Sequence, residues 1–304
     1  MTGSAANDVR MSETPDRRSL SFGPAPCSPT IRVFPYSNKW TPTDEWAFVG
    51  EPPLWRPGTP ETPVRVSVTF TWHKAEAERI AASWSHYYLD VKLGGPAYDD
   101  PGGEFTPGMF LKEGCTITSR GCPKKCGWCV VPTREGAVRE LEIKPGWIVQ
   151  DNNLLACSEK HIRAVFDMLK AQGRRVWFNG GLDKHFLKPW HREIFDSVPI
   201  GELWFACDTA LDLPWLEKAA AILAGYPVRK LRCYTMVGYN GETIADAEAR
   251  LVRVLKLGFL PFAQLYQPET RKHYSDDWRK LCRRWARPAA MLSANAKLTD
   301  HRPE

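Results

Sequence analysis

The feature that most limits the possible folds of this chain is the alternation of strand-like and helix-like segments after position 113. Short runs rich in Val, Ile, Phe and Trp alternate with segments whose apolar residues recur at helical spacing. Such alternation predicts an α/β fold with a parallel sheet, because a helix usually supplies the crossover between parallel strands. A closed eight-stranded barrel needs about 250 residues, so this shorter stretch favours an open, partial (β/α)6 barrel. We expect strands at 115–118, 146–149, 175–178, 202–207, 232–237 and 259–265, and helices at 158–172, 190–198, 214–225 and 243–258.

The residues before position 113 predict a tail, an arm and a small module. Residues 1–30 are rich in Ser, Pro, Ala, Gly and charged residues, a composition typical of a disordered tail. Between 31 and 63 prolines recur beside aromatic residues, so we expect an extended arm whose tryptophans anchor it to a globular body. A small βαβ module completes the region 31–112, with its strand, helix and second strand at 64–71, 74–87 and 88–92.

Three cysteines follow the first strand of the alternating region in one short loop. Cys122, Cys126 and Cys129 have the spacing Cys-x3-Cys-x2-Cys, with Trp128 directly before the last cysteine. Three thiolates from one loop can bind three irons of a cubane cluster and leave the fourth iron open. A closed zinc site has four ligands, so the alternative is that Cys115 completes a four-thiolate zinc site. The spacing favours a 4Fe–4S cluster on the three loop cysteines.

This loop resembles the cluster loop of the radical S-adenosylmethionine superfamily, which has the same spacing and an aromatic residue before the last cysteine. The continuation from Cys129 to Gly136 is similar to the branch that contains methylthiotransferases and cobalamin-linked radical enzymes. The resemblance implies a (β/α)6 partial-barrel enzyme core over 113–270, whose open iron binds S-adenosylmethionine. It also implies that an external electron donor, such as a flavodoxin or ferredoxin, reduces the cluster. Cleavage would then release a 5′-deoxyadenosyl radical that abstracts hydrogen from a substrate, which the sequence does not identify.

Candidate ligands of S-adenosylmethionine stand at the ends of the predicted strands, where functional groups of parallel α/β folds gather. Asp151 and Asn152 lie where the superfamily often contacts the amino group, although a solvated Asx turn also explains them. Gly180 and Gly181 let the backbone approach a ligand closely, or form a plain turn. Asp208 is suited to a ribose hydroxyl, and equally to a helix N-cap.

Two later segments extend this list towards the adenine. Gly238 and Gly241 belong to a stretch that resembles the superfamily's Gly-x-x-Gly-Glu-Thr turn, whose strand backs the adenine. Gln264, near the end of the last strand, is a candidate for a second adenine wall. The residues that touch the substrate remain unassigned.

Two features of the methylthiotransferase and cobalamin-linked branch are missing. The cobalamin signature Asp-x-His-x-x-Gly is absent, and His73 is interpreted as an ordinary side chain at a strand end. A methylthiotransferase normally carries three further cysteines in an N-terminal domain, whereas only Cys27 and Cys115 precede this loop. We therefore expect neither cobalamin nor a second cluster.

Composition points to a reducing compartment. The first residues lack the apolar core of a secretory signal, and no run approaches about 18 apolar residues, so we expect a cytoplasmic protein with no membrane partner. The chain has 304 residues and 9 cysteines, an odd number that argues against a disulfide framework.

The region 271–304 is basic and aromatic. Trp278, Leu281 and Trp285 share one helical face, which favours an amphipathic helix docked on the body with a solvated basic side. The net charge of +6 permits nucleic acid as a partner without requiring it. The alternative to an enzyme is therefore a metal-stapled protein, in which zinc or an inert cluster only stabilises the fold. Such a protein would bind nucleic acid through this segment.

Overall fold

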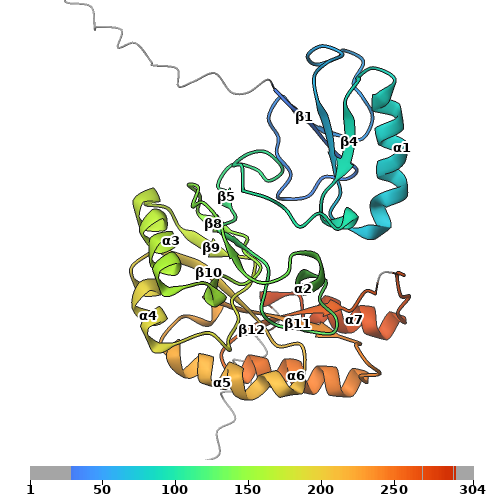
Figure 1. Ribbon diagram of the computed structural model, residues 1–304. Helices are drawn as coiled ribbons and strands as arrows, with labels where there is room; N and C mark the ends of the chain where they lie inside the picture. The colour runs from blue at the N-terminus through green and yellow to red at the C-terminus, as the bar shows by residue number, and fades with distance from the viewer. Residues whose placement is uncertain (1–28, 269, 290, 292–304) are drawn as a thin grey trace, which may run out of the picture.

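A six-stranded parallel sheet is the larger of two sheets in the computed structural model, which describes residues 29–268, 270–289 and 291 (Figure 1). The strand order is β12-β11-β10-β9-β8-β5, so each strand lies beside the strand that precedes it in this sheet along the chain. All neighbouring pairs are parallel, which confirms the expected α/β class. The strands are β5 (Cys115–Thr116), β8 (Ile148–Val149), β9 (Val176–Phe178), β10 (Ile200–Ala206), β11 (Leu231–Val237) and β12 (Leu260–Leu265).

Helices fill the four crossovers from β8 to β12, as the alternating pattern predicted. Ser158 caps one of them by accepting a hydrogen bond from the backbone N–H of His161, and Gly173 ends the same helix with a φ of 59°. Thr243 caps another helix in the same way through the N–H of Asp246. The buried core lies between these helices and the sheet. The helices are α3 (Glu159–Gln172), α4 (Pro189–Asp196), α5 (Leu213–Ile222) and α6 (Ile244–Lys256).

The N-terminal sheet has four strands in the order β2-β1-β3-β4, all parallel, with α1 (Lys74–Ser85) packed on it. The strands are β1 (Ile31–Phe34), β2 (Ala47–Val49), β3 (Val64–Ser67) and β4 (Val91–Gly94). The predicted βαβ module is confirmed as β3, α1 and β4.

The expectation of an extended arm over 31–63 is wrong for the residues of β1 and β2. Ile31–Phe34 is a fully buried inner strand that pairs with both β2 and β3. Prolines such as Pro35 flank the short strands instead of interrupting them, so no donor of the sheet is lost. Trp55 is 64% exposed, so it does not act as the anchor that was expected of it.

Shorter elements connect the two sheets and surround the cysteine loop. A two-stranded antiparallel ladder pairs β6 (Ser119–Arg120) with β7 (Arg139–Glu140) on either side of the loop. The short helix α2 (Val131–Arg134) follows the last cysteine. Single 3₁₀ turns lie at Thr71–His73, Pro96–Tyr98, Leu154–Ala156, Ala210–Asp212 and Val228–Lys230.

The C-terminal helix α7 (Asp276–Arg284) packs against α6 and β12. Leu281 and Trp285 are buried there, and Trp278 is partly buried beside them, as expected of a docked amphipathic helix. The predicted tail over 1–30, apart from its last two residues, and most of the stretch after 289 lie outside the described residues. No helix in the described part of the chain is long and apolar enough to cross a membrane.

Candidate functional site

The cysteine loop is closed at its base by contacts between its two ends. The backbone N–H of Cys122 donates to the carbonyl of Gly136 over 3.1 Å. Glu135 is buried; it accepts a hydrogen bond from the N–H of Gly121 (3.2 Å) and pairs with Arg134 (2.6 Å). Gly121 has a φ of 83°, and a Cβ there would lie 2.2 Å from the carbonyl oxygen of Ala137. Only glycine fits this turn, which therefore holds the start of the loop in place.

The three loop thiols are partly exposed and lie near one another. The N–H of Cys129 donates to the carbonyl of Cys126 over 3.0 Å. Burial raises the pKa of both Cys126 and Cys129, and the neighbouring thiols, Cys122 included, raise it further. Asp208 acts in the same direction on both, so its carboxyl lies within electrostatic range of the loop. Asp208 follows β10, so the loop lies within electrostatic range of the end of that strand.

No three His, Cys, Asp or Glu side chains of the described ranges converge to hold a single metal ion. Thiolates that bind three different irons of one cubane do not converge on one atom, so this finding bears on a mononuclear site more than on a cluster. Cys115 lies buried in β5, where burial raises its pKa to about 11.

Aromatic contacts place the tip of the loop over the ends of β11 and β12. Trp128 meets Tyr239 edge to face, with centroids 5.2 Å apart, and Tyr239 meets Tyr266 at 4.8 Å. Tyr239 follows β11 and Tyr266 follows β12. The cysteines thus come to the carboxyl ends of the parallel strands, where α/β proteins place their ligands.

The end of β8 is tied to the start of the cysteine loop. Asp151 is 1% exposed and accepts hydrogen bonds from the N–H and hydroxyl of Thr118, both at 2.6 Å, and from the hydroxyl of Ser119 at 2.8 Å. Burial raises the pKa of Asp151 against the opposing effect of these donors. Asn152 Oδ1 accepts from the N–H of Gly121 at 3.0 Å. Both side chains thus support the loop, and their contact with S-adenosylmethionine stays a prediction.

Asn153 is a site residue that the sequence did not identify. Its buried amide nitrogen lies 3.4 Å from Cys122 Sγ and 3.3 Å from Asp183 Oδ2, and it donates to both. The carboxylate of Asp183 accepts only, which sets the orientation of this amide, and it also contacts His185 Nδ1 at 2.7 Å. Asn153 Oδ1 is buried and has no hydrogen-bond partner among the described residues. The available signal was its place as the third residue of the polar run that begins at Asp151.

The two glycines after β9 have different surroundings. A Cβ at Gly180 would lie 2.1 Å from the backbone oxygen of Asp151, so this glycine is required where the ends of β8 and β9 meet. Gly181 has a φ of 111° and open space around the position of a Cβ. Gly180 therefore packs against the backbone of Asp151, whereas Gly181 leaves open space beside the end of β9.

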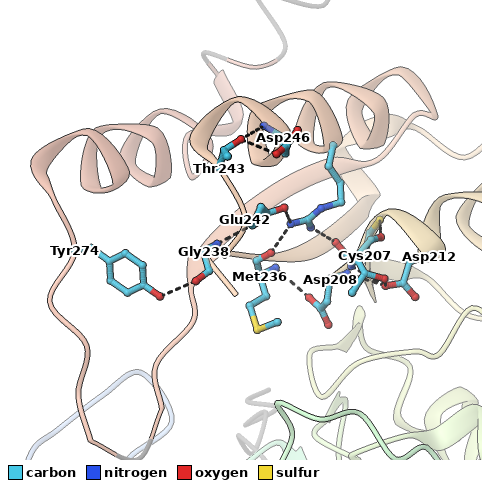
Figure 2. A network of polar contacts seen from close by, with 11 residues as sticks. Cys207, Asp208, Asp212, Met236, Gly238, Glu242, Thr243, Asp246 and Tyr274 are labelled. Carbon is cyan, nitrogen blue, oxygen red and sulfur yellow. Dashed lines mark hydrogen bonds and ion pairs between the residues drawn. The ribbon is translucent and has the colours of Figure 1, made fainter. Parts of the chain in front are cut away.

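A buried arginine, Arg250, holds the ends of β10 and β11 together; Figure 2 labels its partners Cys207, Met236 and Glu242. Arg250 of α6 donates to the carbonyls of Cys207 (2.6 Å) and Met236 (2.8 Å) and pairs with Glu242 at 2.5 Å. Asp208 Oδ1 accepts from the N–H of Met236 at 3.0 Å, and burial raises the pKa of Asp208. Arg250 was not predicted from the sequence, where its only signal is a charge on the apolar face of an amphipathic helix.

The turn after β11 has the backbone geometry that its glycines permit. Gly238 and Gly241 have φ values of 77° and 76°. The N–H of Gly238 donates to Glu242 at 2.9 Å, and a Cβ at Gly238 would lie 2.8 Å from the ring of Tyr274. Figure 2 shows Tyr274 directed at the same turn, where its hydroxyl lies 3.3 Å from the carbonyl oxygen of Gly238. Gln264 is exposed on β12, the edge strand next to β11.

Comparison with known proteins assigns no family to the chain: no protein-family model matches it, and no curated protein matches it. The loop, its thiols and the strand ends beneath them therefore carry the information on function.

Proposed function

We propose that the protein is a radical S-adenosylmethionine enzyme. The observation that carries the proposal is the position of three partly exposed thiols of one loop whose tip packs on Tyr239, at the carboxyl end of a parallel sheet and within electrostatic range of Asp208. The six strands follow chain order in the sheet, and a helix fills most crossovers. This arrangement is compatible with a (β/α)6 partial barrel, whose open mouth would hold the cofactor.

The donor set of the loop fits a 4Fe–4S cluster. Cys122, Cys126 and Cys129 would hold three irons and leave the fourth for S-adenosylmethionine, as thiolates are the usual ligands of such clusters. The amide of Asn153, which already donates to Cys122 Sγ, supplies the kind of hydrogen bond that tunes a cluster's potential. Asn153 Oδ1 is buried and has no partner among the described residues. It could therefore accept a hydrogen bond from a bound ligand.

The bound cluster would supply the electron that cleaves S-adenosylmethionine to a 5′-deoxyadenosyl radical, after reduction by an external donor such as a flavodoxin or ferredoxin. The chain's own residues bind and orient. Asp208 uses Oδ1 for the backbone of β11, so Oδ2 stays available for a ribose hydroxyl. Gly181 leaves open space beside the end of β9, and Tyr239 and Tyr266 offer apolar ring surface that would exclude water near the adenine.

The iron and sulfide content of anaerobically purified protein tests this proposal. We expect about four irons and matching sulfide per chain, lost on replacement of any of the three loop cysteines by alanine. Cys115→Ala is the matched control and should keep the iron, because Cys115 is buried in β5. Zinc in place of iron, lost equally in all four variants, would contradict the proposal and favour the metal-stapled alternative.

A further inference from the structure

A cavity of about 540 Å³ lies between the N-terminal sheet and the segment that connects this sheet to the cysteine loop. Its walls come from β3 and β4 with the residues that follow them (Thr69, Gly95 and Pro96), from residues within 100–111, and from Ile117 and Arg120. Figure 1 shows this connecting segment between β4 and β5. The volume is within the range of pockets that hold small organic ligands. No residue of the proposed S-adenosylmethionine site lines it.

The sheet contributes a polar wall to this cavity. Val64 and Val66 of β3 pack in the core beneath α1, and successive side chains of a strand point to opposite faces. Arg65 and Ser67 therefore face away from α1, towards residues 100–111. Lys92 of β4 is paired in register with Arg65 and lies on the same side.

The opposite wall is apolar. Phe105 is buried, Phe110 is 40% exposed, and Leu111 and Ile117 complete an apolar lining opposite the sheet. Partly exposed aromatic and aliphatic side chains that face a cavity favour an apolar ligand body.

Arg120 is the cation that remains available in this cavity. Its guanidinium packs on Gly102, where a Cβ would lie 2.4 Å from Cζ, and its Nε donates to the carbonyl of Gly103 over 3.2 Å. Among the described residues Arg120 forms no ion pair with a carboxylate, whereas Arg65 and Lys92 both pair with Asp90, at 2.7 and 3.6 Å. The contacts with Gly102 and Gly103 thus fix the position of the guanidinium, and its remaining N–H groups are available to donate to a ligand.

The two acidic residues of the lining already accept backbone hydrogen bonds. Asp100 accepts from the N–H of Gly102 at 2.8 Å, and Glu104 accepts from the N–H of Glu142 at 3.0 Å. Neither is within ion-pair distance of Arg120 in the described ranges. An anion that enters the cavity therefore meets an arginine that has no carboxylate within ion-pair distance in the described part of the chain.

We propose that this cavity binds a small amphipathic anion, with its carboxylate or phosphate on Arg120 and its apolar body against Phe105, Phe110 and Leu111. An arginine fork matches both head groups, because each offers paired oxygens. The site is distinct from the cysteine loop and does not depend on the proposed enzymatic activity. Arg120 belongs to β6, which leads directly into Gly121 and Cys122, so the occupant would lie against the base of that loop.

Anilinonaphthalene sulfonate, an aromatic anion whose fluorescence rises in apolar sites, is a suitable probe for the full-length protein. We expect one saturable site, with binding weakened about tenfold or more in Arg120→Gln, the loss expected for a charged hydrogen bond. The uncharged analogue phenylnaphthylamine is the matched probe, and its affinity should be equal in wild type and Arg120→Gln. Displacement by naphthoate and by naphthyl phosphate then distinguishes a carboxylate head from a phosphate head.

A second pair of variants tests the position of the site. Gly103 lines the cavity, has no positive φ, and leaves open space around a Cβ. Gly103→Phe should fill the cavity and abolish probe binding, while Gly103→Ala should keep it, with unchanged melting temperatures in both. A variant with all three loop cysteines replaced by alanine should still bind the probe. Binding that is unaffected by both Arg120→Gln and Gly103→Phe would overturn the proposal.

Discussion

Trp128 meets Tyr239 edge to face, with ring centroids 5.2 Å apart and ring planes at 68°. The contact joins the residue before Cys129 to the turn after β11, two segments far apart in sequence. Gly127 adds to it, since a Cβ there would lie 3.2 Å from the hydroxyl of Tyr239. The ladder of β6 and β7 thus positions the base of the cysteine loop, and the turn after β11 positions its tip.

The base of the loop gives a matched pair of glycine variants. Gly121→Ala places a Cβ 2.2 Å from the carbonyl oxygen of Ala137, whereas Gly136→Ala meets nothing within 4 Å. Both positions have a positive φ, so both variants bear a backbone cost of about 1–2 kcal/mol. The additional clash at Gly121 should displace Cys122 and lower the iron bound per chain, measured beside the melting temperature. Equal iron in the two variants would show that this turn does not position the thiols.

His191 of α4 predicts a dependence of stability on pH. It is 1% exposed, its Nδ1 accepts from the N–H of Lys188 at 2.8 Å, and burial lowers its pKa from 6.5 to about 4. Between these two values the unfolded chain binds more protons, so stability falls as the pH falls from about 6.5 towards 4. The loss between pH 7 and pH 5 should be about 2 kcal/mol.

His191→Gln separates this effect from other titrations. Glutamine keeps an acceptor for the N–H of Lys188 near the start of the helix but does not titrate. Urea unfolding at pH 7 and pH 5 should show a smaller loss of stability in the variant than in wild type. The same loss in both proteins would mean that His191 is not held neutral by the fold.

In the C-terminal helix, we expect a buried aromatic side chain to contribute to stability and an exposed charged one to contribute little. Trp285→Ala should lower the free energy of unfolding by about 3–5 kcal/mol, because the ring is buried against α6 and β12. Arg283→Glu changes an exposed side chain of the same helix and should alter stability by only about 0.5 kcal/mol. Thermal unfolding of the two variants checks this. Salt-sensitive binding of tRNA that is lost on reversal of Arg283, Arg284 and Arg287 would instead favour a nucleic-acid interface.

Much of the larger sheet could be predicted because its signals are local. The helix expected at 158–172 is found as Glu159–Gln172, since a capping serine, a final glycine and regular apolar spacing all lie within the segment. The strands at the amino end were harder to predict. Ile31–Phe34 and Ala47–Val49 are very short and are surrounded by prolines and turns. Their place in a sheet depends on the pairing of β1 with β3, which lies about 30 residues further along the chain.

Site contacts that depend on distant segments were not predictable in the same way. The spacing of the three cysteines identifies the loop, but nothing near Asn153 in sequence indicates that its amide reaches Cys122 Sγ. Asp151 was assigned to a cofactor, whereas its structural partners Thr118 and Ser119 become visible only when β5 and β8 pair. Arg250 likewise needs the ends of β10 and β11 to explain its burial.

The most direct test of the central claim is an assay of S-adenosylmethionine cleavage by the anaerobically prepared protein after reduction with dithionite. We expect slow formation of 5′-deoxyadenosine and methionine without added cobalamin, and none in the Cys126→Ala variant, whose cluster would lack a ligand. The absence of product from iron-loaded, folded protein, with or without cobalamin, would contradict the proposed function. Product that forms only when cobalamin is present would show that the N-terminal sheet has a role this account does not assign to it.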